Sequence, residues 1–197
     1  DKSNPAPSVL RAIAPFPFFP AAAAADIQNP ANFYRIFASN QPEARNEIWG
    51  VSATIAAELG DATLKSITAY RELDGFSTSD PDGTRFRLYD QDTDTDQTQF
   101  SQELQLSGDA ADGALSYLIG GYFFRERAVQ ELRLCFAPIT NTPTAPNNPC
   151  NTWTQGNNQV TKSTAIFGQA RYNFSDAFSV TLGGRYTWDK KDIVSNQ

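Results

Sequence analysis

The sequence predicts an all-β protein, namely an antiparallel segment of a transmembrane β-barrel with long extracellular loops. Three observations support this fold class. Apolar and polar residues alternate in stretches long enough for a tilted strand to cross a membrane, which takes about 9–11 residues. Aromatic residues stand at both ends of an apolar stripe, and short connections alternate with long ones, as they do in bacterial outer-membrane barrels.

The clearest alternation lies in residues 165–191, where two runs flank a tight turn at 175–177. Successive side chains of a strand point to opposite faces, so each run has one apolar and one polar face. Phe167 is the one large apolar residue among the polar positions of the first run. In the second run we predict that the large apolar residues face lipid: Phe178, Val180, Leu182, Tyr186 and Trp188.

Taken in order along the chain, the same alternation predicts further strands at 47–59, 63–72, 96–107, 114–131 and 161–174. The apolar residues of the second and fourth of these occur on both parities, so their facing stays open. Short turns are predicted at 60–62, 108–113 and 175–177, and long loops at 73–95 and 132–160. A soluble meander has no reason to sort its connections in this way, which favours a membrane barrel.

Two regions are expected along the chain. Residues 1–46 form an irregular extracellular loop region, in which Pro15, Pro17 and Pro20 interleave with phenylalanines. Proline has no N–H to donate to a strand ladder, so this stretch is not a central strand. Residues 47–197 hold the transmembrane β-barrel strands, with short periplasmic turns and long outer loops. The sequence contains no methionine and no secretory signal, so we expect a processed or internal piece of a longer chain.

The composition argues against several classes of function. The net charge is −6 and histidine is absent. Binding to nucleic acid would need a basic face, so no nucleic-acid partner is expected. Histidine is the commonest general base and metal ligand, and no pair of carboxylates lies in an evident pocket. We therefore expect no enzyme activity, no catalytic residues, no metal site and no cofactor.

The two cysteines, Cys135 and Cys150, lie in one loop rich in proline, asparagine and threonine. This placement predicts a disulfide formed in an oxidising compartment. A metal site is less favoured, because two thiolates are too few ligands.

Four aspartates alternate with polar residues before the strand at 96–107, and they could gather a calcium ion through their carboxylate oxygens. They lack the glycine and glutamate spacing of an EF-hand, which favours a solvated acidic entry to the strand. The four residues are Asp90, Asp92, Asp94 and Asp96.

Polar residues on the parity opposite the lipid-facing stripe are predicted to line the barrel interior. They could contact a substrate path or an internal domain, or form an ordinary polar wall. Gln102 is a polar exception on the apolar parity. The interior candidates are Glu103, Gln105, Gln169, Arg171 and Arg185.

Four stretches together resemble the middle of the barrel of TonB-dependent receptors, the energised outer-membrane transporters of Gram-negative bacteria. They are TLKSITAYRE (63–72), QTQFSQELQLSG (97–108), LSYLIGGYFFRE (115–126) and the run 165–191. The resemblance covers most of residues 47–192 and implies a barrel of about 22 strands around an N-terminal plug. The chain shows no plug, no TonB box and no closing aromatic strand, and its strands, about six, are too few to close such a barrel.

The resemblance implies that this chain is part of an outer-membrane receptor that imports a scarce nutrient, such as a ferric siderophore or a glycan, into the periplasm. The implied partners are outer-membrane lipid, an unknown small ligand, and the inner-membrane TonB complex, which would bind an N-terminal region that this chain does not show. Two alternatives stay open: an outer-membrane barrel that anchors a surface adhesion or interaction protein, and a soluble carbohydrate-binding β-sandwich.

Overall fold

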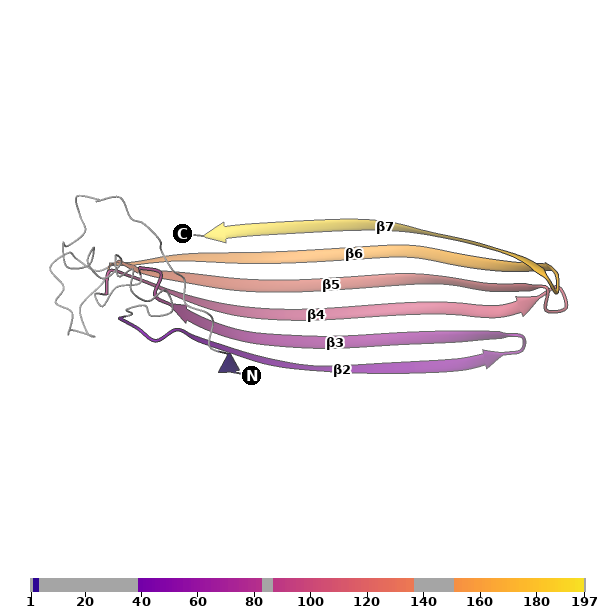
Figure 1. Ribbon diagram of the computed structural model, residues 1–197, viewed down its shortest axis with the longest axis horizontal. Helices are drawn as coiled ribbons and strands as arrows, with labels where there is room; N and C mark the ends of the chain where they lie inside the picture. Colours follow the sequence, from indigo (N-terminus) through magenta and orange to yellow (C-terminus); the bar gives the residue numbers. More distant parts are fainter. Residues whose placement is uncertain (1, 4–38, 83–86, 137–150, 197) are drawn as a thin grey trace, which may run out of the picture.

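The computed structural model describes residues 2–3, 39–82, 87–136 and 151–196, which form one antiparallel sheet (Figure 1). Its strands lie in chain order, so every neighbour in the sheet is also a neighbour in the sequence. A two-residue strand, β1 (Lys2–Ser3), pairs with the first of six long ones. The long strands are β2 (Glu43–Leu59), β3 (Ala62–Ser79), β4 (Tyr89–Ala110), β5 (Leu115–Phe136), β6 (Asn151–Ser175) and β7 (Phe178–Asn196). The predicted all-β antiparallel class is confirmed.

The connections are sorted by length between the two ends of the sheet. Tight turns join β2 to β3, β4 to β5 and β6 to β7 at one end, called here the short-turn end (Figure 1). β3 and β5 end, and β4 and β6 begin, at the opposite end of the sheet, called here the long-loop end (Figure 1). Gly60 and Gly113 have φ angles of 68° and 86° in these turns, a backbone conformation that glycine adopts without steric cost. The predicted order of short and long connections is therefore present.

The strands are longer than predicted at the long-loop end. β3 continues to Ser79 and β4 begins at Tyr89, so most of the predicted loop 73–95 is paired strand. Likewise β5 reaches Phe136 and β6 starts at Asn151, inside the predicted loop 132–160, while β2 starts at Glu43 rather than at residue 47. Most of these stretches carry polar side chains on both faces, which hides the strand period; the exception is the end of β5, where Leu132, Leu134 and Phe136 share one face. Their backbones still pair with neighbouring strands, because ladder hydrogen bonds do not depend on side-chain polarity.

The register gives the sheet two chemically different faces. Residues directly opposite each other in paired strands point to the same face. Trp188 is opposite Thr164, which is opposite Phe123, and this row continues through Gln102 on β4. The face that contains this row and Leu182 is called the apolar face below, and the opposite one the polar face.

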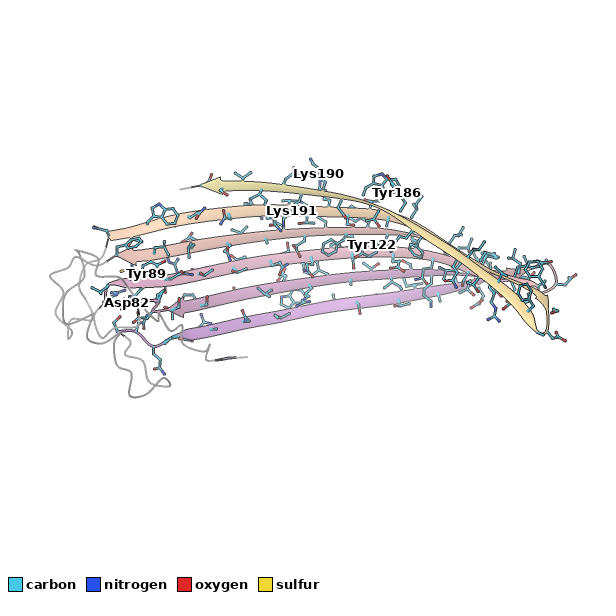
Figure 2. All side chains as sticks on the ribbon, turned by 45° about the horizontal axis from the view of Figure 1, so that its top comes forward. Asp82, Tyr89, Tyr122, Tyr186, Lys190 and Lys191 are labelled. Atoms are coloured by element: carbon cyan, nitrogen blue, oxygen red, sulfur yellow. The ribbon has the colours of Figure 1, made fainter. Side chains whose placement is uncertain are left out.

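The apolar face is the more exposed of the two. Ile55, Ile166 and Leu182 on it have exposed fractions of 69%, 58% and 74%. On the polar face of β5, by contrast, Leu118 and Tyr122 are partly buried. A curled sheet crowds the side chains on its concave side, so this contrast makes the apolar face the convex one. The arched ribbons of Figure 2 have Tyr186 on this outer side.

The register also shows which face each residue of β3 occupies, which the sequence had left open. On β3, Leu64 and Tyr70 belong to the apolar face together with Ser66 and Thr68, and Ile67 lies on the polar face. Polar atoms on the apolar face bind one another. The Thr68 hydroxyl donates to Oε1 of Gln102 at 2.6 Å, and Nε2 of Gln102 donates to the Ser66 hydroxyl at 3.0 Å. Mutual hydrogen bonding explains how Gln102 can occupy an apolar stripe.

Among the described residues, no helix has the length and hydropathy needed to cross a membrane.

Candidate functional site

All five predicted interior residues lie on the polar face of the sheet. Glu103 and Gln105 are on β4, Gln169 and Arg171 on β6, and Arg185 on β7. Two of them share one row: Gln105 is opposite Gly120, Gly120 is opposite Phe167, and Phe167 is opposite Arg185. Gln169 and Arg171 lie closer to the short-turn end, where Nη2 of Arg171 donates to the Ser179 hydroxyl at 3.2 Å.

Arg185 lies over two aromatic rings, one from each of two neighbouring strands. Its guanidinium carbon is 5.4 Å from the ring centroid of Tyr122 and 5.6 Å from that of Phe167. Cations within about 6 Å of an aromatic face are attracted by the ring quadrupole. Nε of Arg185 also donates to the Thr187 hydroxyl at 3.2 Å. Phe167, the exception in the alternating pattern, therefore serves as the platform for a cation of the polar face.

A glycine makes room for this arrangement. The Phe167 ring lies against the backbone of Gly120, where a Cβ atom would overlap it and would also come within 2.7 Å of the Leu104 carbonyl oxygen. Gly121, the next residue, points to the other face, and a Cβ there would meet its nearest atom only at 3.9 Å. The close approach of ring and backbone thus depends on one glycine of the pair.

The carboxylate of Glu103 lies on the same face, one row away from Gln105 and Arg185. Glu103 is opposite Tyr122, and Nε2 of Gln105 donates to its Oε1. Cation, aromatic rings, carboxylate and amide thus share one surface, which can offer hydrogen bonds and stacking to a polar ligand or to another protein domain. Sequence reasoning named Glu103, Gln105 and Arg185, but it missed Tyr122 and Phe167 as their partners, because only the register brings them together.

A family model described as "TonB dependent receptor-like, beta-barrel" matches residues 5–197. The chain belongs to this family. Members of the TonB-dependent receptor barrel family are outer-membrane proteins of Gram-negative bacteria, so the predicted family and location are confirmed.

A solved structure has the same fold as this barrel segment: "the crystal structure of the ferric yersiniabactin uptake receptor FyuA from Yersinia pestis". The two chains are 10% identical, the TM-score is 0.54, and the match covers 79% of this chain and 26% of that one. The chain therefore spans about a quarter of the length of this structural neighbour. A search of curated protein sequences finds no match.

At the long-loop end of the TonB-dependent receptor segment, three aspartates are almost fully buried: Asp80, Asp82 and Asp90, with exposed fractions of 3–4%. Oδ2 of Asp80 accepts hydrogen bonds from the backbone N–H and the hydroxyl of Ser39 at 2.7 and 3.0 Å. Asp82 accepts from the backbone N–H of Tyr89 at 2.9 Å. These carboxylates tie the segment before β2 and the start of β4 to the end of β3.

Burial changes the acidity of these groups. It raises the pKa of Asp80, and the neighbouring Asp82 carboxylate raises it further. Burial also raises the pKa of Asp90, although the Arg87 guanidinium, which forms an ion pair with it, acts in the opposite direction. Sequence reasoning missed Asp80 and Asp82, and their only signal was the turn-forming order Asp80-Pro81-Asp82-Gly83.

The four alternating aspartates share one face of β4, as their spacing predicts, and it is the face that continues from the apolar stripe. Asp94 forms an ion pair with Arg133, which also pairs with Glu131 at 2.9 Å. Within the described ranges, no three acidic, histidine or cysteine side chains are placed to hold a metal ion. Asp94 is thus engaged with an arginine across the β4–β5 pair.

Cys135 lies at the end of β5, is buried, and is disulfide-bonded. Cys150 is the only other cysteine of the chain and lies outside the described residues. The pairing of Cys135 with Cys150 therefore stays a prediction.

Proposed function

We propose that this chain is a wall segment of an active outer-membrane importer, which takes up a scarce nutrient such as a ferric siderophore or a glycan. The main support is the apolar face. Over the described strands, no Asp, Glu, Lys or Arg lies on this face from the row of Leu182 to the row of Trp188. A wall whose outer surface excludes charge over such a span is suited to hydrocarbon.

The length of the stripe fits a bilayer. Ten residue steps separate Phe178 from Trp188, which is about 34 Å along a strand at about 3.4 Å per residue. At a tilt of about 45° this becomes roughly 24 Å, close to the apolar band of about 25 Å on outer-membrane barrels. Aromatic pairs stand at both ends. Phe174 and Phe178 are 5.5 Å apart between ring centroids, and Tyr186 and Trp188 are 4.4 Å apart.

In this proposal the apolar, convex face contacts lipid and the polar, concave face lines the interior. The five predicted lipid-facing residues are exposed on the first of these faces. Glu103, Gln105 and Arg185 with its two rings would line the path of the ligand or hold an internal domain. Energy would come from the inner-membrane TonB complex, acting on a part of the receptor outside this segment.

An uptake assay tests the proposal. Cells that produce the full-length protein are given siderophores loaded with radioactive iron, and accumulation is measured with and without the TonB complex. We expect accumulation that requires both the protein and the complex, and that a protonophore abolishes.

Three outcomes would contradict it. Uptake that continues without the TonB complex would indicate a passive pore. Surface binding to a partner, without uptake of siderophores or labelled glycans, would favour the anchor or adhesion alternative. A ligand-selective pore formed in liposomes by the 197 residues alone would indicate a small autonomous barrel.

A further inference from the structure

Three cations form a row at the long-loop edge of the apolar stripe. Lys190 of β7 is directly opposite Lys162 of β6, and Lys162 is directly opposite Arg125 of β5. They belong to the apolar face, because each is two positions from an apolar-face residue of its own strand: Trp188, Thr164 and Phe123. All three are exposed. This set of Arg125, Lys162 and Lys190 is called the cationic row below.

The row is unfavourable for the sheet itself. Side chains directly opposite each other on paired strands have Cβ atoms about 4.5–5.5 Å apart, and like charges in these positions repel. Within the part of the chain that the structure describes, neither Arg125 nor Lys162 has a carboxylate in ion-pair contact. Lys190 has one, Asp192, at 3.2 Å, and both side chains of that pair are more than half exposed. Three adjacent cations with one weak counter-charge indicate that an anion completes the site.

The position of the row indicates which anion. On one side of it lie uncharged rows with Phe123 and Trp188, and on the other side lie the polar ends of the strands. The acidic residues of this face all lie on the long-loop side of the row. Asp192 and Glu72 are one row away, and Asp94, Asp96 and Glu131 are farther out. A ligand with apolar chains and an anionic group would match this arrangement. Its chains would lie along the apolar stripe, and its anionic group would lie at the cationic row, on the long-loop edge of the stripe.

We propose that the cationic row binds the phosphate groups on the headgroup of an anionic lipid in the outer leaflet. This inference rests on the proposed outward orientation of the apolar face. The lipid's acyl chains lie along the uncharged rows, and its phosphates lie between the guanidinium of Arg125 and the ammonium groups of Lys162 and Lys190. A free phosphate ion lacks the apolar part and gains nothing from the stripe.

Native mass spectrometry of the full-length protein tests this. Detergent-purified protein is incubated with lipid A that carries two phosphates, or with lipid A of the same acyl chains and one phosphate, and the retained lipid is counted. A basic residue at an anionic membrane surface strengthens binding by about fivefold, so Arg125→Gln/Lys162→Gln/Lys190→Gln should weaken retention of the two-phosphate form by roughly a hundredfold.

The control has the same charge change on the other face: Lys65→Gln/Arg71→Gln/Lys191→Gln. Lys191 is the next residue after Lys190 on β7, so its side chain points to the opposite face of the sheet (Figure 2). This control should retain the lipid like the unmodified protein. A charge-preserving variant, Arg125→Lys/Lys162→Arg/Lys190→Arg, should retain it as well, and circular dichroism checks that every variant is folded.

Equal retention by the cationic-row variant and the unmodified protein would overturn the proposal, as would an equal loss in the control. Displacement of the lipid by equimolar inorganic phosphate would also contradict it. If retention does not depend on the row while Leu182→Arg impairs membrane insertion more than Thr181→Arg, the lipid site fails and the orientation stands. If Thr181→Arg is the more harmful substitution, the proposed orientation itself fails.

Discussion

Gly120 and Gly121 are adjacent glycines that should respond differently to the same substitution. An alanine Cβ at position 120 would overlap the ring of Phe167 and lie 2.7 Å from the backbone carbonyl oxygen of Leu104. The ring can rotate away, but the carbonyl belongs to a paired strand and cannot move alone. At position 121 the nearest atom to the new Cβ is 3.9 Å away, an ordinary contact.

The magnitudes follow from these distances. Overpacking costs about 1–3 kcal/mol, and a displaced Phe167 would also lose its contact with Arg185, worth about 0.5–1 kcal/mol at an exposed site. Gly121→Ala meets no obstacle and should stabilise by about 0.4–1 kcal/mol, since alanine restricts the unfolded chain. Gly120→Ala and Gly121→Ala should therefore differ by roughly 2 kcal/mol or more in the free energy of unfolding.

Urea-induced unfolding of the full-length protein in lipid vesicles measures this difference. Phe167→Leu, placed in the Gly120→Ala background, should restore part of the loss, because the shorter side chain leaves room for the methyl group. Equal stability of the two alanine variants would refute the close approach of ring and backbone at Gly120, and with it the register of β5 against β6.

Three further predictions concern other parts of the segment. Leu182→Arg should destabilise the membrane-inserted protein by about 2–4 kcal/mol, whereas Thr181→Arg, on the polar face, should cost at most about 1 kcal/mol; comparison of their urea midpoints decides, and equal damage would contradict the facing. Mass spectrometry without reductant should find Cys135 linked to Cys150, a bond worth on the order of 3 kcal/mol, and two free thiols in protein from intact outer membrane would contradict it. Because burial raises the folded-state pKa of Asp80 above its ordinary value of 3.8, the local stability of this end should fall as pH rises from that value through the folded-state pKa. Hydrogen exchange should show this pH trend in the native protein and a flatter one in Asp80→Asn, and an equal slope in both would contradict it.

Much of the fold follows from the sequence because one face of each strand must be apolar over a fixed length. The period-two pattern of residues 178–188 was enough to predict a strand, its two faces and its neighbouring turn. The ends of β3 and β4 were missed for a physical reason. Stretches such as Asp92-Thr93-Asp94 are polar on both faces, so no hydrophobic period marks them, and only pairing with a neighbour makes them strands.

The partners within the site could not be read from the sequence. Phe167 looked like an exception among polar positions, and Tyr122 lies in a strand whose facing the sequence left open. Their role as platforms for Arg185 depends on a register that no local pattern fixes. The ion pair of Arg133 with Asp94 joins residues 39 positions apart for the same reason. The cationic row is a similar case, since its three members come from three strands and only their alignment makes them one surface.

The orientation of the sheet in the membrane is the central claim, and accessibility measurements along β7 test it most directly. Single spin labels are placed in turn at positions 178–189 of the full-length protein in vesicles, and collisions with oxygen, which concentrates in lipid, are compared with collisions with a water-soluble nickel chelate. We predict that even-numbered positions, including Leu182 and Tyr186, collide more with oxygen, and that odd-numbered positions, including Thr181 and Arg185, collide more with the chelate. The reverse alternation, or no alternation, would contradict a lipid-facing apolar wall.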